Sequence, residues 1–134
     1  MSELPTKAPK MSEDSKPFWD ATAEGRFLLQ RCTDCDTVIW WPRALCPNCS
    51  SFDLEWFDAK GEGKVYSYTT VHQSQGRWNG VTPYVLAYVE LDEGPRVMTN
   101  IVDSDPADVK VDSRVRVVWD DTGEGNALPR FTLA

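Results

Sequence analysis

Residues 32–49, CTDCDTVIWWPRALCPNC, contain every cysteine of this 134-residue chain and decide how its first half folds. The cysteines form two Cys-x2-Cys pairs, Cys32/Cys35 and Cys46/Cys49, with ten residues between the pairs. Zinc prefers a tetrahedral cage, and four thiolates supply one when a hairpin brings two such pairs face to face. Ten residues are enough for a short strand and its return, so the spacing predicts a zinc ribbon with a structural zinc.

Two other uses of the four sulfurs remain open, namely disulfides and a redox centre such as iron in the same cage. The N-terminus, MSELPTKAPKMSEDSK, lacks the apolar segment of a secretory signal, and no run approaches the roughly 20 apolar residues of a membrane span. These features favour a cytoplasmic protein, in which thiols stay reduced and bind metal. Four sulfur ligands would fill the zinc coordination sphere, so we expect no catalysis at the metal.

The residue after each cysteine pair often needs a positive φ angle, which glycine adopts most easily. Asp36 and Ser50 occupy these two positions here. Aspartate tolerates the left-handed conformation better than serine does, so the pattern predicts an unusual but feasible pair of zinc knuckles.

The chain divides into four parts by composition. Residues 1–14 are polar and predict a flexible leader. Ser15 and Pro17 predict the start of a helix over residues 15–26, with Gly25 as its stop signal. Residues 27–58 correspond to the zinc ribbon and residues 59–134 to a separate β-rich part.

Five strand-like segments occupy residues 59–134. In order they are KVYSYTTVH, YVLAYVEL, RVMTNIV, RVRVVWD and LPRFTL, and Asp92-Glu93-Gly94 marks a hairpin between the second and third. The longest connection, between the third and fourth, has room for one helical turn. This order predicts a Greek-key barrel of the OB type, although a five-stranded sandwich would give a similar pattern. The predicted fold class is therefore mainly β: an N-terminal helix, a rubredoxin-like zinc ribbon and a five-stranded OB-type barrel.

The charge of the chain bears on its partners. The net charge is −7, the isoelectric point is near 4.6, and residues 90–124 contain ten acids against four bases. Zinc ribbons and OB barrels often bind single-stranded nucleic acid, and Tyr66, Tyr68 and Trp78 could stack on bases, so this function is kept as an alternative. An acidic surface without a basic patch repels phosphate backbones, which argues against it.

The sequence contains no convincing catalytic set. His72 is the only histidine, and no cysteine remains to act as a nucleophile. No G-x-S-x-G, P-loop or dinucleotide-binding motif is present.

Three tryptophans, Trp40, Trp41 and Trp78, are candidates either for the core or for contacts with a partner. Trp40 is expected in the core of the ribbon, and strand alternation would then direct Trp41 to the opposite face, toward another element or a partner. Trp78 lies in the polar loop QSQGRWNGVTPY, where it is a candidate interface or ligand-contacting residue.

The order of these parts resembles a known family. A helix with PFWDATAEGRFLLQRC leads into a ribbon with WPRALCPNC, followed by EWFDAKGEGKVYSYTTVH, PYVLAYVELDEGPRVMTNIV and LPRFTLA. Over roughly residues 15–134 this is similar to the acyl-CoA-associated zinc-ribbon/OB-fold proteins, known as domain of unknown function family thirty-five. The absence of glycine after each knuckle is the main departure from the family pattern.

The resemblance implies an accessory, non-catalytic subunit that binds a thiolase-like enzyme, often as a heterotetramer. Such a subunit helps to form the acyl-CoA site for aldol or thiolytic cleavage of carbon–carbon bonds, for example in steroid side-chain CoA esters. Only the four cysteines match a family site residue by residue. CoA needs cations for its phosphates and flat surfaces for adenine, so our own candidates for ligand or partner contact are Trp41, Arg43, Gln75, Arg77 and Trp78.

Overall fold

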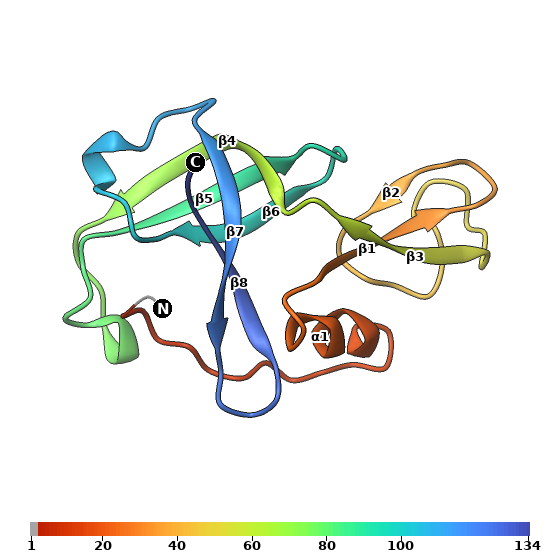
Figure 1. The fold of residues 1–134 in the computed structure, drawn as a ribbon, viewed down its shortest axis with the longest axis horizontal. Helices are drawn as coiled ribbons and strands as arrows, with labels where there is room; N and C mark the ends of the chain where they lie inside the picture. The colour runs from red at the N-terminus through yellow and green to blue at the C-terminus, as the bar shows by residue number, and fades with distance from the viewer. Residues whose placement is uncertain (1–2) are drawn as a thin grey trace.

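A computed structural model describes residues 3–134 and contains one short helix, a three-stranded sheet and a closed five-stranded barrel (Figure 1). The ribbon lies at one end of the long axis and the barrel at the other, with the helix beside the ribbon. The predicted fold class is confirmed, including the closure of the sheet into a barrel rather than a sandwich. No helix among the described residues is long and apolar enough to cross a membrane.

The helix α1 spans Lys16–Thr22 and is shorter than the predicted range of residues 15–26. Gly25 adopts a φ of 70°, and the N–H groups of Gly25 and Arg26 bond to the carbonyls of Thr22 and Ala21. This is a Schellman motif, in which glycine supplies the left-handed residue that ends the helix. Ser15 occupies the N-cap position, but its side chain bonds to Ser12 instead of the first helical turn.

The ribbon is an antiparallel sheet in the order β2-β1-β3. Its strands are β1 (Phe27–Cys32), β2 (Val38–Ile39) and β3 (Leu54–Ala59). Strand β1 pairs with β3 over its full length, from Phe27 opposite Ala59 to Cys32 opposite Leu54. Cys32 ends β1 and Cys35 lies in the turn that follows it, whereas Cys46 and Cys49 lie in the loop before β3.

The barrel has the strand order β4-β5-β6-β8-β7. Its strands are β4 (Glu62–Val71), β5 (Tyr84–Leu91), β6 (Arg96–Ile101), β7 (Arg114–Asp121) and β8 (Ala127–Leu133). The predicted turn at Asp92–Gly94 joins β5 to β6. The long connection between β6 and β7 contains the predicted helical turn, the 3₁₀ helix η2 (Pro106–Asp108).

Only Lys60 and Gly61 separate the ribbon from the barrel. Gly61 has a φ of 74°, and a Cβ atom there would lie 2.5 Å from Cγ1 of Val117. Both the backbone conformation and the lack of space therefore require glycine at this position.

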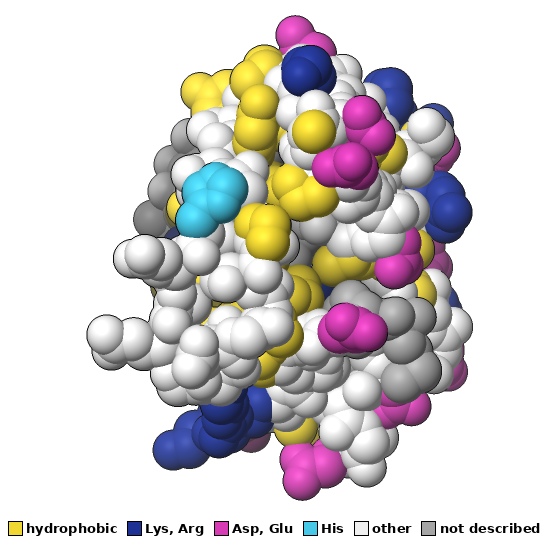
Figure 2. Space-filling model, turned by 90° about the vertical axis from the view of Figure 1, so that its left-hand side faces the viewer, with side chains coloured by type: hydrophobic (Ala, Val, Ile, Leu, Met, Phe, Trp, Pro, Cys, Tyr) yellow, Lys and Arg dark blue, Asp and Glu magenta, His cyan; other side chains and the backbone are white. Residues whose placement is uncertain are grey.

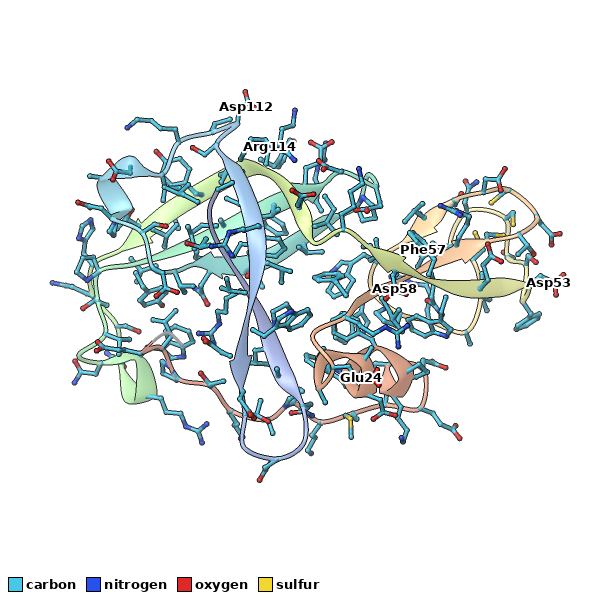
Figure 3. The ribbon with its side chains drawn as sticks, viewed as in Figure 1. Glu24, Asp53, Phe57, Asp58, Asp112 and Arg114 are labelled. Atoms are coloured by element: carbon cyan, nitrogen blue, oxygen red, sulfur yellow. The ribbon has the colours of Figure 1, made fainter. Side chains whose placement is uncertain are left out.

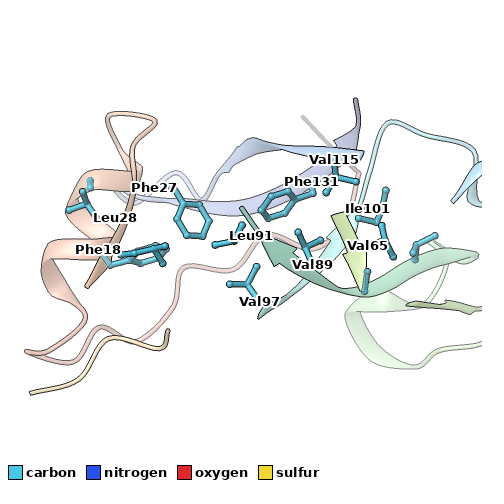
Figure 4. Packing of buried hydrophobic residues seen from close by; sticks show 14 of the residues in the cluster. Phe18, Phe27, Leu28, Val65, Val89, Leu91, Val97, Ile101, Val115 and Phe131 are labelled. Carbon is cyan, nitrogen blue, oxygen red and sulfur yellow. The ribbon is translucent and has the colours of Figure 1, made fainter. Parts of the chain in front are cut away.

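One hydrophobic core runs from α1 through the ribbon into the barrel (Figure 4). Phe18 of α1 packs edge-on against Phe27 of β1, with ring centroids 5.6 Å apart. Phe27 in turn lies 6.4 Å from Phe131 of β8. Because these side chains are almost completely buried, the ribbon and the barrel pack as one unit rather than as two separate modules.

The segment before α1 contains neither helix nor strand, yet it lies along the barrel. The backbone carbonyl of Pro5 accepts a hydrogen bond of 2.9 Å from Nη2 of Arg130. The predicted flexible leader is thus bonded to the barrel at Pro5, whereas its residues 1 and 2 lie outside the described part of the chain.

Candidate metal centre and ligand contacts

The two zinc knuckles have the same backbone design. In the first, the N–H of Cys32 bonds to the carbonyl of Thr37 and the N–H of Asp36 bonds to the carbonyl of Cys32. In the second, the N–H of Cys46 bonds to the carbonyl of Ser51 and the N–H of Ser50 bonds to the carbonyl of Cys46. The predicted positive φ angles are confirmed, at 61° for Asp36 and 65° for Ser50.

These knuckles bring the four cysteine sulfurs together, and all four lie within 4.8 Å of one another. The Sγ atoms of Cys32 and Cys49 are 3.5 Å apart, and those of Cys35 and Cys46 are 3.6 Å apart. A zinc–sulfur bond of about 2.3 Å implies sulfur–sulfur edges of about 3.8 Å in a tetrahedron. The cluster therefore has the right donor atoms and size for zinc, while all four cysteines are free rather than disulfide-bonded.

Polar groups beside the cluster act on the sulfurs. The Thr37 hydroxyl lies 3.1 Å from Sγ of Cys35, and Nδ2 of Asn48 approaches the same sulfur at 3.6 Å. Hydrogen bonds from Thr37, and then from Asn48, lower the pKa of Cys35 to about 6. Neither residue was predicted from the sequence, although positions within and next to Cys-x2-Cys pairs are the places where donors to sulfur occur.

The last cysteine behaves differently. The backbone N–H of Ser51 lowers the pKa of Cys49, but the surrounding sulfurs of the other cysteines outweigh it and raise that pKa to about 12. Four sulfurs lie in one small space, and a bound dication would offset the repulsion between them as they lose their protons.

Trp40 and Trp41 do not point to opposite faces as alternation predicted. Strand β2 ends at Ile39, so neither tryptophan belongs to a strand. Both rings contact Phe18, at centroid distances of 5.2 and 5.9 Å, and Trp41 keeps 40% of its surface exposed. Together with Trp19 they form an aromatic cluster between the helix and the ribbon.

Arg43 lies next to this cluster, on the loop between the knuckles. The Gln30 side chain anchors this loop by accepting from the Arg43 backbone N–H and donating to its carbonyl. The Arg43 Nε donates to the carbonyl of Trp41 at 3.0 Å, and the rest of the guanidinium group is exposed.

The other three candidates lie at the opposite end of the molecule, in the loop between β4 and β5 (Figure 1). Trp78 ends the 3₁₀ helix η1 (Gly76–Trp78), is half-buried, and packs against Tyr84 at a centroid distance of 4.7 Å. Gln75 and Arg77 are exposed. The structure therefore separates the five candidates into two groups and does not assemble them into one site.

Arg77 lines a hollow of about 650 Å³ between this loop and the N-terminal segment. Lys7 lines the same hollow, and neither cation has an ion-pair partner among residues 3–134. Glu3 and Glu124 also line it, so its charge is balanced. The sequence analysis missed Lys7, because a lysine in a polar leader gives no signal of its place in the fold.

His72 is exposed at the end of β4 and lines a separate hollow with Gln75 and Asn79. Figure 2 views this end of the barrel, with the histidine (cyan) on the surface beside hydrophobic side chains. Its side chain makes no hydrogen bond to residues 3–134, including the hydroxyls of Ser74 and Thr82 that line the same hollow.

The nucleic-acid alternative finds little support on the barrel. Tyr66 is exposed, but the guanidinium of Arg96 lies 3.8 Å from its ring centroid and covers one face. That face of the ring is therefore already stacked and less available to a base.

Comparison with known proteins gives matches over both parts of the chain. Residues 19–55 match the family profile described as "ChsH2, rubredoxin-like zinc ribbon domain", and residues 56–120 match "ChsH2, C-terminal OB-fold domain". A solved structure, "Ltp2-ChsH2(DUF35) aldolase", superimposes with a TM-score of 0.83 and 34% identity, covering 94% of this chain and 98% of that one.

Curated relatives carry several different names. A "Probable enoyl-CoA hydratase alpha subunit" of Thermomonospora curvata is 35% identical over 94% of this chain. A "DUF35 domain-containing scaffold protein" of Methanocaldococcus jannaschii is 39% identical over 66% of it, and "Benzoylsuccinyl-CoA thiolase subunit BbsA" of Geobacter metallireducens is 34% identical over 53%. The chain spans only 39%, 64% and 47% of the lengths of these three relatives.

Proposed function

The chain belongs to the DUF35 family of zinc-ribbon/OB-fold proteins, and from this premise we propose that it is an accessory subunit of a thiolase-like enzyme acting on acyl-CoA. The observation that carries the proposal is the match to the DUF35 chain of an aldolase over nearly the full length of both chains. The likeness to a benzoylsuccinyl-CoA thiolase subunit points to the same class of partner.

In this proposal the partner supplies the catalytic residues. The four cysteines form the metal cluster, and His72 makes no hydrogen bond to an acid or a hydroxyl of the described chain. The contribution of this chain is a shaped surface beside the partner's active site. A heterotetramer with two copies of each chain is the assembly we expect.

We further propose that Cys32, Cys35, Cys46 and Cys49 hold one zinc ion. Zinc bound by four thiolates has no open coordination position, and it stabilises the fold without taking part in the reaction. Its role would be to fix the loop that carries Trp41 and Arg43, since this loop connects the two cysteine pairs.

The acyl-CoA contacts proposed for this chain are Trp41 and Arg43 at the ribbon, and Gln75, Arg77 and Trp78 at the far end of the barrel. A single CoA thioester requires cations for its phosphates and a flat surface for its adenine. The Arg77 group brings two cations, Arg77 and Lys7, to one hollow, with the ring of Trp78 on the same loop. Glu3 and Glu124 line that hollow too, so a phosphate would have to bind at the cations and away from these carboxylates.

Co-expression with a thiolase-like protein of the same genome tests this function. The expected result is a stable complex by size-exclusion chromatography with light scattering, and carbon–carbon cleavage only when both chains are present. The assay should follow retro-aldol and thiolytic cleavage of steroid, aromatic and short-chain acyl-CoA esters. A partner that is fully active alone and never associates with this chain would contradict the proposal.

A further inference from the structure

The far end of the ribbon exposes large apolar side chains that the fold does not use. We call residues 33–36 and 45–53 the ribbon tip. Phe52 is 76% exposed, the largest fraction among the large hydrophobic residues of the described chain, and Leu45 is 38% exposed. Pro47, between them in sequence, is exposed as well. Burying an exposed phenylalanine side chain contributes about 1.5–3 kcal/mol of free energy. A partner surface that covers Phe52 would therefore gain this free energy on binding.

The backbone holds these side chains in place. The N–H of Cys46, which follows Leu45, bonds at 2.8 Å to the carbonyl of Ser51, which precedes Phe52. The carbonyl of Phe52 also accepts a bond of 3.0 Å from the N–H of Leu54. Phe52 is thus presented by an ordered knuckle, so little conformational freedom remains to be lost on binding.

The surroundings of this apolar group are acidic. The ribbon tip contains Asp34, Asp36 and Asp53 and no base, a net charge of −3, and Glu55 just beyond it lies opposite Arg31. All four acids are exposed, and none has an ion-pair partner in residues 3–134. Figure 3 shows Asp53 at the end of the ribbon that points away from the barrel.

Charge also decides which occupant fits. A second copy of this chain carries a net charge of −7, and two acidic tips repel each other. Nucleic acids and anionic membranes are excluded on the same ground. A protein surface with an apolar pocket rimmed by lysine and arginine is complementary in both respects.

We propose that the ribbon tip docks into such a basic-rimmed apolar pocket on the thiolase-like subunit, with Phe52 as the central anchor. This inference rests on the proposed function for the identity of the partner. It goes beyond that function by assigning the contact to one end of the ribbon rather than to the barrel.

The outer face of the barrel offers a matched comparison. Met98 on β6 is 61% exposed and lies opposite Tyr88 of β5, which is 48% exposed. The acid and base next to them, Glu90 and Arg96, are also opposite each other, so this face lacks the acidic rim. A substitution at Met98 therefore removes a comparable exposed side chain without touching the ribbon tip.

The experiment measures the dissociation constant between this chain and the co-expressed thiolase-like subunit for the wild type, Phe52→Ser and Met98→Ser. The expected result is at least a tenfold weaker complex for Phe52→Ser and less than a twofold change for Met98→Ser. Zinc content and circular dichroism should match the wild type, since Phe52 is largely exposed. Asp53→Asn should weaken binding at low salt and reduce its dependence on salt concentration.

The binding of the wild type tests the proposed function, and the comparison of the two variants tests the docking inference. If the wild type binds and Phe52→Ser binds equally well, the docking inference is wrong and the accessory function stands. The docking inference is also wrong if Met98→Ser weakens binding as much as Phe52→Ser. If the wild type does not bind a thiolase-like subunit, the proposed function and the docking inference fall together. A photoreactive benzoylphenylalanine should crosslink to the partner from position 52 and not from position 98.

Discussion

The hydroxyl oxygen of Thr22, in the last turn of α1, accepts a hydrogen bond of 3.0 Å from the backbone N–H of Ala127, which begins β8. The same hydroxyl donates to the carbonyl of Trp19 at 2.6 Å. Both Thr22 and Ala127 are buried. A single side chain therefore both closes the helix and attaches it to the barrel.

Replacing this threonine by valine should destabilise the whole chain. Thr22→Val keeps the shape of the side chain but leaves the N–H of Ala127 buried without its partner, which costs about 1–3 kcal/mol. Urea denaturation followed by tryptophan fluorescence would measure this loss. The exposed Thr69→Val is the control, and an equal stability of both variants would show that the Thr22–Ala127 bond is unimportant.

Substitution in the buried ion pair of Asp120 and Arg130 should cost more stability than Thr22→Val. The Oδ2 atom of Asp120 lies 3.1 Å from Nη1 of Arg130, and both side chains are about 5% exposed or less. Burial lowers the pKa of Arg130, although the guanidinium remains charged at neutral pH. Asp120→Asn removes the neutralising charge and should cost about 3–5 kcal/mol in urea denaturation. Glu124→Gln, on the exposed loop between β7 and β8, should change stability by less than about 0.5 kcal/mol.

The protein should lose stability at low pH, in part because the surface ion pair of Arg114 and Asp92 is lost. Arg114 forms a two-pronged contact with Asp92, at 2.9 and 3.0 Å, and this hydrogen bonding holds the pKa of Asp92 below its usual value. The folded state therefore binds fewer protons than the unfolded chain. The contribution is complete above the unfolded carboxyl pKa of about 3.9 and is lost as the pH falls through the lower folded value.

Melting temperatures between about pH 6 and pH 2 would test this linkage. Asp92→Asn should reduce the fall in melting temperature at low pH, and Arg114→Gln should reduce it to the same extent. The double variant should resemble either single variant. Additive effects would mean that the two residues act separately.

Removal of zinc should disorder the ribbon. The metal-loaded protein should be colourless with about one zinc per chain, since ferric iron in the same cage would be red. Chelation should shift the tryptophan emission, because Trp40 and Trp41 lie on the loop between the cysteine pairs, and added zinc should restore it. Cys46→Ser should show the shifted emission even with zinc present. An unchanged spectrum after complete metal loss would contradict a structural role.

Arg77 should contribute to acyl-CoA affinity in the assembled enzyme. Arg77→Ala should raise the KM of the complex for its acyl-CoA about tenfold, or ~1.4 kcal/mol, which is near the value of a hydrogen bond to a charged group. The kcat should be unchanged, because a phosphate contact is made equally in the ground and transition states. Arg116→Ala on the exposed side of β7 is the control, and a KM unaffected by Arg77→Ala would remove this residue from the site.

Local patterns predicted the metal cluster and most of the barrel. The spacing of the four cysteines determines the knuckles almost alone, including the left-handed residues Asp36 and Ser50, because each knuckle is closed by bonds between neighbours. The hairpin at Asp92–Gly94 was predicted for the same reason. Each strand of the barrel is marked by its own β-branched and aromatic residues.

Contacts between distant segments were not predicted. Trp40 and Trp41 were assigned to alternate faces of a strand, but the strand ends at Ile39 and both rings contact Phe18. The position of Pro5 against Arg130 depends on a pairing across 125 residues, which no local pattern encodes. The candidate ligand residues were likewise grouped by type, whereas the fold places them at opposite ends.

The two-residue connection at Lys60 and Gly61 limits how this protein can be cut or recombined. The two family profiles meet between residues 55 and 56, which is inside β3 rather than between the ribbon and the barrel. A fragment beginning at residue 56 would carry an unpaired half-strand and lose Phe18 and Phe27 from its core. Chimaeras that exchange ribbons among relatives should therefore be joined at Gly61. The incoming ribbon should carry an aromatic residue at the position of Phe27, which contacts Phe131 and Trp119 of the barrel.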